Sequence, residues 1–499
     1  MKTYTKNLFL LPALIAAFGL IPTGRVAAQT FTTLHSFTGF DGAYPYDGLL
    51  LLANKLYGTA ANGGGAGGPG AVFAINADGA GFTNLHGITA SEGAEPYDGF
   101  ILSGDTLYGT TSGLGNYGSN GSGTVFAIKT NGTGYTNLYS FTALDPTYHN
   151  TNYDGASPRA GLVLLGNTLY GTAIYGGSLG KGTVFAVNTD GTGFTNLHNF
   201  MGPSGSTTNN DGNAPWGGLI LSGNTLYGTT AFGSGIDNGT LFKINTDGTG
   251  YTNFYNFRFL DYNAALDVFT NADGANPFGG LILSGDTLYG TANNGGAAGS
   301  GTVFAVSTNG TSFRTLHSFT LIPPYPPHVN GDGSQPYGSL FLSGSTLYGT
   351  AAYGGSSANG TVFAVQTNGT GFTILHTFKA TALDETSSFY TNSGGANPFG
   401  ALVISGNNLY GTAKQGGGSG AGTVFSISLP QPQLTIIRSA ANVILAWPTN
   451  AAGFTLQSTT NLFPTCWSPV AQAAVTNAGQ ISVTVPTTDG GKFFRLESQ

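Results

Sequence analysis

Short apolar runs, separated by turn residues, recur along most of the chain. In one representative stretch the runs span residues 218–222, 225–230, 240–244 and 251–257. Gly-Asn joins the first two runs and Asp-Gly joins the last two. Both dipeptides favour tight hairpins because they tolerate positive φ. The pattern therefore predicts a four-stranded antiparallel meander, whose strands we name A, B, C and D in chain order.

Every predicted B strand contains Leu-Tyr-Gly-Thr, which occurs seven times in the chain. The copies begin at Leu56, Leu107, Leu169, Leu226, Leu288, Leu347 and Leu409. Their start-to-start spacings are 51, 62, 57, 62, 59 and 62 residues. Repetition at such a period marks a modular ring or array. Four short strands in each copy favour a β-propeller, in which every meander is one blade.

The two ends of the repeat array complement each other. Residues 31–37 read as a D strand with no A, B or C strand before it, whereas the last copy stops after its C strand at 423–427. Counted together, there are seven A–B–C sets and seven D strands. We therefore predict an all-β fold, a seven-bladed β-propeller closed by pairing of the N-terminal D strand with the last C strand. A β-solenoid, the alternative, gives no reason for the ends to match.

The regions outside the repeats predict export and a second domain. Two Lys residues, an apolar run and Val-Ala-Ala predict a secretory signal peptide over 1–28. Pro-rich residues 430–433 read as a linker, and the alternating strands of 434–499 predict a small β-sandwich. The propeller is expected over 29–429. No later segment is apolar enough for a transmembrane span in the mature chain.

Composition limits the partners of this chain. It has 15 basic and 22 acidic residues, a net charge of −7 and no Lys/Arg cluster, so we expect no nucleic-acid partner. Cys466 is the only cysteine, which leaves no internal disulfide and makes a small buried side chain its simplest role. We expect a monomer that is secreted or held at the cell surface.

One repeat unit resembles a known family. It reads G-L-I-L-S-G-x-T-L-Y-G-T, then a Gly-rich loop, then G-T-V-F-A-[IV]-x-T-[DN]-G-T-G-[FY]-T-x-L-H-x-F. This unit resembles the GloVer-type tandem repeat of secreted bacterial proteins, most closely at 218–257 and 281–319. The resemblance implies a secreted or surface role, with a C-terminal anchoring or sorting module like the fibronectin-like modules of such proteins. Kelch-type propellers also combine Gly with aromatic residues, and we expect each Leu-Tyr-Gly-Thr tyrosine to lie between two blades.

The connections between D and A strands vary in length. Because variable loops on a rigid scaffold usually carry binding sites, we expect function on the face that carries the D–A and B–C connections. Most of these connections end in Asp-Gly-x-x-Pro followed by an aromatic residue. The candidate ligand-binding residues after the Pro are Tyr46, Tyr97, Arg159, Trp216, Phe278, Tyr337 and Phe399. They can stack on sugar rings or on partner side chains. Because the aromatic residue recurs in nearly every blade, we favour the other interpretation, in which each aromatic side chain packs between two blades. Arg159 and Trp216 depart most from the repeated motif and are the best individual candidates for ligand binding.

An Asn-x-Asp-Gly pattern precedes four of these motifs. Its residues are Asn152, Asp154, Asn209, Asp211, Asn271, Asp273, Asn330 and Asp332. Alternating oxygen ligands before a Gly resemble a fragment of a calcium loop, so calcium is the candidate cofactor. No later carboxylate recurs to complete the loop, and we favour an Asx turn.

Histidines recur in the predicted D strands and are expected to be structural, because side chains on separate blades cannot converge on one metal ion. His149 and His328 are the two outside that pattern. No catalytic motif is present. We therefore predict a non-catalytic scaffold that binds carbohydrate or protein on the face that carries the D–A and B–C connections, which we name the long-loop face. The alternatives are a polysaccharide-active enzyme using the loop acids Asp145, Asp261, Asp267, Asp384 and Glu385, or a structural envelope spacer.

Overall fold

The structure, a computed structural model, describes only part of the chain. It covers residues 29–498 apart from 66, 117–120, 148–149, 202–210, 234–236, 324, 387, 431–433, 440, 449–453, 462–466, 478–479 and 487–491. Contacts divide the described residues into two units, Gln29–Leu429 and Pro430–Glu497, and we describe each by itself. The predicted signal peptide, His149 and Cys466 lie outside the described residues.

Seven four-stranded antiparallel sheets make up most of the described part of the first unit. Their A strands are β2 (Leu50–Leu52), β6 (Ile101–Ser103), β10 (Val163–Leu165), β14 (Ile220–Ser222), β20 (Ile282–Ser284), β24 (Phe341–Ser343) and β30 (Val403–Ser405). Their B strands are β3 (Lys55–Ala60), β7 (Thr106–Thr111), β11 (Thr168–Ala173), β15 (Thr225–Thr230), β21 (Thr287–Ala292), β25 (Thr346–Ala351) and β31 (Asn408–Ala413).

The C and D strands complete each sheet in chain order. The C strands are β4 (Ala71–Asn76), β8 (Thr124–Lys129), β12 (Thr183–Asn188), β16 (Thr240–Asn245), β22 (Thr302–Ser307), β26 (Thr361–Gln366) and β32 (Thr423–Ser428). The D strands are β5 (Thr83–Gly87), β9 (Thr136–Ser140), β13 (Thr195–Asn199), β17 (Thr252–Asn256), β23 (Arg314–Ser318), β27 (Thr373–Thr377) and, for the last sheet, β1 (Thr30–Ser36). We number the sheets 1 to 7 in the order of their A strands.

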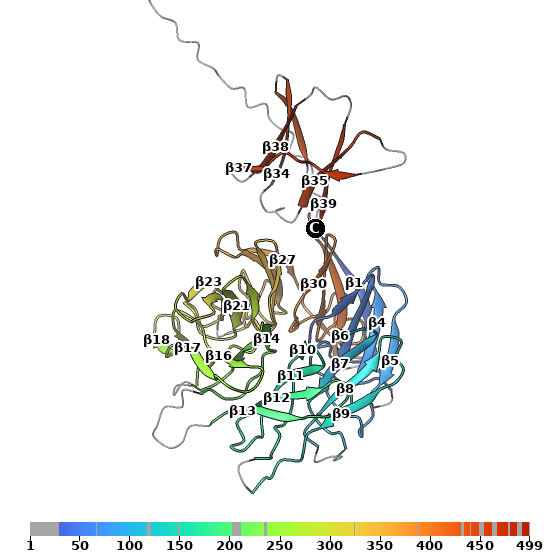
Figure 1. Cartoon of the computed structure of the whole chain (residues 1–499), viewed down its shortest axis with the longest axis vertical. Helices are drawn as coiled ribbons and strands as arrows, with labels where there is room; N and C mark the ends of the chain where they lie inside the picture. Colours follow the sequence, from blue (N-terminus) through green and yellow to red (C-terminus); the bar gives the residue numbers. More distant parts are fainter. Residues whose placement is uncertain are drawn as a thin grey trace, which may run out of the picture. The chain divides into compact units, whose positions relative to one another are not determined.

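Strand β1 closes the array. It pairs antiparallel with β32, with Phe31 opposite Ile427 and Thr33 opposite Phe425. In Figure 1, β1 lies at the blue end of the colour scale beside strands from the far end of the repeat unit. The predicted pairing of the N-terminal D strand with the last C strand is therefore confirmed.

The threonine of each Leu-Tyr-Gly-Thr copy links its sheet to the next. Its Oγ1 donates a hydrogen bond to a backbone carbonyl just before the next A strand. The pairs are Thr59–Asp98, Thr110–Ala160, Thr172–Gly217, Thr229–Gly279, Thr291–Gly338, Thr350–Gly400 and Thr412–Asp47, with distances from 2.7 to 3.4 Å. Because the last pair returns to sheet 1, the seven bonds form a closed circle, and the fold is β-propeller-like.

The other residues of Leu-Tyr-Gly-Thr pack the sheets. Tyr410 of sheet 7 joins a buried cluster with Leu49 and Leu56 of sheet 1, so its ring lies between sheets, as predicted. The glycine admits a phenylalanine from the neighbouring strand. A Cβ on Gly58 would lie only 2.5 Å from Cζ of Phe73, so even alanine would disturb this contact. The regular motif is therefore a packing device.

A second set of contacts, which we name the outer ring, joins the D strands to the loops that follow them. In sheet 5, His317 Nε2 lies 2.9 Å from Asp332 Oδ2, and the imidazole stacks on Phe372 of sheet 6 at 3.5 Å between ring centroids. His35, His86 and His198 pair in the same way with Asp41, Glu92 and Asp211. These contacts confirm that the D-strand histidines are structural.

Three positions of the outer ring depart from the His–carboxylate pair. Tyr139 and Tyr255 replace the histidine and donate to Asp154 and Asp273 at 2.8 and 2.6 Å. His376 stacks on Phe31 at 3.9 Å, but Gly394 stands where the other copies carry a carboxylate. Burial lowers the pKa of His376 from 6.5 to about 4, and nearby Lys379 adds to the shift.

Two long D–A loops carry small hairpins of their own. They are β18 (Asp261–Asn263) with β19 (Val268–Thr270), and β28 (Ala382–Asp384) with β29 (Phe389–Thr391). Within its own loop, His328 Nδ1 donates a hydrogen bond to the Pro323 carbonyl oxygen at 3.1 Å. The described part of the chain contains no helix long and apolar enough to cross a membrane.

The second unit is also all-β. One sheet has the order β33-β34-β38-β37 and the other the order β36-β35-β39. The strands are β33 (Thr435–Ser439), β34 (Asn442–Pro448), β35 (Phe454–Thr459), β36 (Ser468–Pro469), β37 (Val475–Asn477), β38 (Gln480–Pro486) and β39 (Phe493–Ser498). Leu445, Trp447 and Leu456 share one buried cluster drawn from both sheets.

Candidate functional site

The proline before each A strand fixes the position of the residue after it. The residue before the proline has a left-handed backbone, with φ of 55° at both Tyr44 and Ser157, so the chain turns sharply there. The proline then packs on a glycine of the preceding sheet. A Cβ on Gly422 would lie 2.6 Å from Cδ of Pro45. The contact between neighbouring sheets at this point is thus made by proline and glycine.

The seven residues after these prolines meet in a closed circle, which we name the inner ring. It consists of Tyr46, Tyr97, Arg159, Trp216, Phe278, Tyr337 and Phe399. The five aromatic pairs between neighbours have ring centroids 4.7 to 5.6 Å apart. Arg159 completes the circle, because its guanidinium lies 4.4 Å from the Tyr97 ring centroid and 4.9 Å from that of Trp216.

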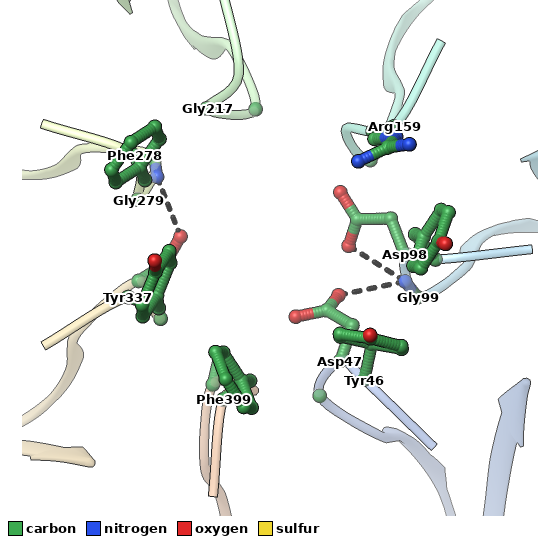
Figure 2. A pocket seen from close by; sticks show the side chains of 18 of the residues that line it. Tyr46, Asp47, Asp98, Gly99, Arg159, Gly217, Phe278, Gly279, Tyr337 and Phe399 are labelled. Atoms are coloured by element: carbon green, nitrogen blue, oxygen red, sulfur yellow. Dashed lines mark hydrogen bonds between the residues drawn. The ribbon is translucent and has the colours of Figure 1, made fainter. Parts of the chain in front are cut away.

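The inner ring lines a cavity of about 590 Å³ to which all seven sheets contribute. Figure 2 shows the labelled side chains arranged around this space. Tyr353 and Lys414, which come from B–C connections, also line it. Residues of the D–A and B–C connections, which belong to the face expected to carry function, therefore contribute much of the cavity lining. The aromatic residues contact one another and line the cavity, so the two interpretations of the motif are compatible.

The residues directly after the inner-ring residues form a neighbouring layer of the cavity wall, which differs between the two sides of the cavity. The residue after each inner-ring residue is Asp47 and Asp98 in sheets 1 and 2, Ala160 in sheet 3, and glycine in the other four sheets. Asp47 Oδ2 and Asp98 Oδ1 both accept a hydrogen bond from the Gly99 N–H, at 2.7 and 2.6 Å (Figure 2). Two carboxylates therefore stand side by side, opposite a wall of bare backbone.

Sequence reasoning missed both carboxylates and Lys414. Burial raises the pKa of Asp47, although hydrogen bonds from the backbones of Gly48, Gly99 and Ala401 oppose the rise. Neither Asp47 nor Asp98 forms an ion pair with a described residue. The sequence signal that could have found the two carboxylates is an Asp at a position that is Gly or Ala in the other five copies.

Two cations lie among the aromatic residues of the ring. Lys414 Nζ lies 4.5 Å from the Tyr46 ring centroid and 5.2 Å from that of Phe399. Arg159 is held in the same way, and its Nε is buried without a hydrogen-bond partner, as is Trp216 Nε1. Burial raises the pKa of Tyr97 to about 12; the Glu95 carboxylate adds to the rise and Arg159 opposes it. Cations and carboxylates therefore alternate with aromatic surface in one cavity.

The Asn-x-Asp-Gly oxygens, the candidate calcium ligands, form hydrogen bonds within the fold. Asn152 Oδ1 accepts from Gly155 and Gly177, and Asn271 and Asn330 are used in the same way. Asp154, Asp211, Asp273 and Asp332 accept from the outer ring, and Asn209 lies outside the described residues. Within the described ranges no group of three or more His, Cys, Asp or Glu is placed to hold a metal ion. The Asx-turn alternative accounts for these contacts.

The loop acids do not gather at the cavity. None of Asp145, Asp261, Asp267, Asp384 and Glu385 is among the described residues that line it. Asp267 instead accepts a hydrogen bond from Tyr262 at 2.6 Å within its own hairpin. The acids proposed for the enzyme alternative are therefore not those that the structure brings together.

Solved structures with some similarity include oligogalacturonate lyase from Vibrio parahaemolyticus. It is 9% identical, with a TM-score of 0.44, and the match covers 81% of this chain and 98% of that one. A putative 6-phosphogluconolactonase from Bacteroides fragilis is 16% identical, with a TM-score of 0.43, covering 89% and 98%. Such neighbours include β-propeller proteins, and similarity at this level says nothing about activity. No curated protein matches the chain.

The repeats themselves do identify a family. The Gloeobacter/Verrucomicrobia repeat matches at residues 17–152, 146–266, 206–388 and 262–476, which together span most of the chain and extend beyond the region 31–429 in which the repeat pattern is clearest. The chain therefore belongs to the Gloeobacter/Verrucomicrobia (GloVer) repeat family.

Proposed function

We propose that this protein is a non-catalytic binding protein that holds a carbohydrate in the central cavity. The observation that carries the proposal is the convergence of the inner ring, Asp47 and Asp98 on one cavity. A volume of about 590 Å³ lies within the range of small-ligand sites. Because D–A and B–C connections line the cavity, we expect a glycan end to enter it from the long-loop face.

The two halves of the cavity match the two kinds of surface on a sugar. A sugar ring has C–H groups that pack on aromatic side chains and hydroxyls that need hydrogen-bond partners. Trp216, Phe278 and Tyr337 supply aromatic surface beside a glycine-lined wall. Asp47 and Asp98 accept hydrogen bonds, while Lys414 and Arg159 donate them. A polyol can therefore use both halves at once.

The finer architecture and the location belong to the same proposal. The sheet order and the closed circle of threonine bonds support a seven-bladed β-propeller closed by β1. The two sheets of Pro430–Glu497 support a fibronectin-like β-sandwich. With the predicted signal peptide, they support a secreted or surface-held monomer whose second unit serves in attachment or export.

Isothermal titration against a panel of oligosaccharides tests the proposal. We expect at least one glycan to bind the wild-type protein, and Trp216→Ala to weaken its binding by about tenfold or more. Tyr153→Ala is the matched control, because Tyr153 is an aromatic side chain that is 88% exposed and lies outside the cavity lining. Wild-type affinity in Trp216→Ala, or no binding by any glycan, would contradict the proposal.

A further inference from the structure

We infer that Asp47 and Asp98 form a subsite for a protonated amino group, which makes amino sugars the ligand class of the cavity. The inference rests on the proposed function and names the chemistry of the same site. It follows from the position of the two carboxylates, from their lack of an ion pair with a described residue, and from the two cations that already lie in the cavity.

The two carboxylates are neighbours that share one backbone donor. Their oxygens lie 2.7 and 2.6 Å from the same Gly99 nitrogen. Two like charges at this separation repel each other unless a proton or a cation comes between them. No ion pair to a described residue supplies that cation. A positively charged ligand group would relieve the repulsion.

Their placement argues against a role in cleaving a glycosidic bond. Glycosidases set two carboxyl groups on either side of the scissile bond. Asp47 and Asp98 belong to adjacent sheets and meet at Gly99, so both approach a ligand from one wall (Figure 2). This arrangement suits recognition of one group on the ligand by two acceptors.

The two cations of the cavity already lie against aromatic rings of the protein. Arg159 and Lys414 each lie between two aromatic rings, which attract positive charge through their faces. These two side chains show that the inner ring accepts cations. Asp47 and Asp98 lie in the neighbouring layer, opposite Gly217, Gly279 and Gly338, whose backbone lines that side of the cavity.

An ammonium group fits this subsite because it carries three N–H donors and no acceptor. It can donate to both carboxylates, and charge-assisted hydrogen bonds of this kind are stronger than neutral ones. The rest of the sugar then lies over the glycine-lined wall, against the aromatic half of the ring. No covalent step is involved.

Titration with four oligosaccharides of matched length tests the inference: a glucosamine oligomer, its N-acetylated counterpart, a neutral glucose oligomer and a uronic acid oligomer. At a pH where the free amine is protonated, we expect the glucosamine oligomer to bind about tenfold more tightly than the two neutral oligomers. In Asp98→Asn and in the Asp47→Asn/Asp98→Asn double variant, we expect the glucosamine oligomer to bind no more tightly than the two neutral oligomers. Asp261→Asn, an exposed acid outside the cavity, should keep the preference.

The outcomes separate the inference from the function on which it rests. Equal binding of amine and N-acetyl forms would overturn the inference and leave carbohydrate binding intact. Tightest binding of the uronic acid oligomer would also overturn it, and would assign ligand charge recognition to Arg159 and Lys414. No binding by any oligomer would overturn both. A variant with normal thermal unfolding that retains the amine preference would equally count against the subsite.

Discussion

The inner and outer rings are both sevenfold, yet they use their repeats differently. In the outer ring six of the seven positions pair His or Tyr with Asp or Glu, and the same contact recurs from sheet to sheet. In the inner ring and the layer beside it, Arg159, Asp47, Asp98 and Lys414 each break the repeat. Regular positions hold the sheets together, whereas the irregular ones concentrate chemistry in the cavity.

The largest effect on stability should come from weakening the packing of β1, the strand that closes the array. Phe31→Ala removes a ring that stacks on His376 at 3.9 Å and packs near Phe378 and Phe425. We expect the free energy of unfolding to fall by about 3 kcal/mol, measured by chemical denaturation. Phe40→Ala, at an exposed phenylalanine, is the control. A change below about 1 kcal/mol would show that closure by β1 matters little.

Breaking one regular pair should have the next largest effect. His317→Ala removes one hydrogen-bond partner of the buried Asp332 and the stack on Phe372, while Thr320 still donates to Asp332. We expect a loss of about 2 kcal/mol in denaturant unfolding, with glycan affinity unchanged once the protein is folded. Loss of affinity in a fully folded variant would show that the two rings do not have separate roles.

The irregular position of the outer ring should make the protein sensitive to acid. The folded-state pKa of His376 is about 4 and its ordinary value is 6.5, so the unfolded state binds the proton first as pH falls. Stability should therefore decline between pH 6.5 and 4, by about 2 kcal/mol. His376→Phe keeps the stack on Phe31 and should remove this part of the decline. Parallel pH profiles of the two proteins would disprove the assignment.

Restoring the missing carboxylate should have the smallest effect, and a favourable one. A Cβ on Gly394 would meet its nearest neighbour, Phe31, at 3.4 Å, which is ordinary contact. Gly394→Asp should therefore place a partner near His376, raise the pKa of that histidine and stabilise the fold by about 1 kcal/mol. NMR titration of the imidazole and thermal unfolding measure the two effects. An unchanged pKa would mean that the Asp does not reach His376.

Much of the scaffold could be predicted because its rules are local. Turn dipeptides, the Leu-Tyr-Gly-Thr period and the orphan D strand at residues 31–37 were enough to predict the meander and the pairing of β1 with β32. The structural role of the D-strand histidines also follows from their position. Their carboxylate partners were not anticipated, because the pairing joins a strand to a loop up to 15 residues later in the chain.

The cavity could be predicted only in part because it depends on ring closure. The inner-ring residues were identified from their motif, but a repeated aromatic residue fits packing and binding equally well until all seven copies are placed around one axis. Asp47, Asp98 and Lys414 are far apart in sequence, and nothing local shows that they converge. Only their departure from the other copies marks them: Asp47 and Asp98 stand where five copies have Gly or Ala, and Lys414 stands where the other copies have an uncharged residue.

The proposed function requires that the inner ring encloses the ligand site. A crystal structure of the protein with an oligosaccharide that it binds tests this most directly. We expect a sugar inside the cavity, in contact with Trp216 and with the carboxylates of Asp47 and Asp98. An oligosaccharide found only on the exposed β18–β19 or β28–β29 hairpins, with the cavity free of it, would contradict the claim.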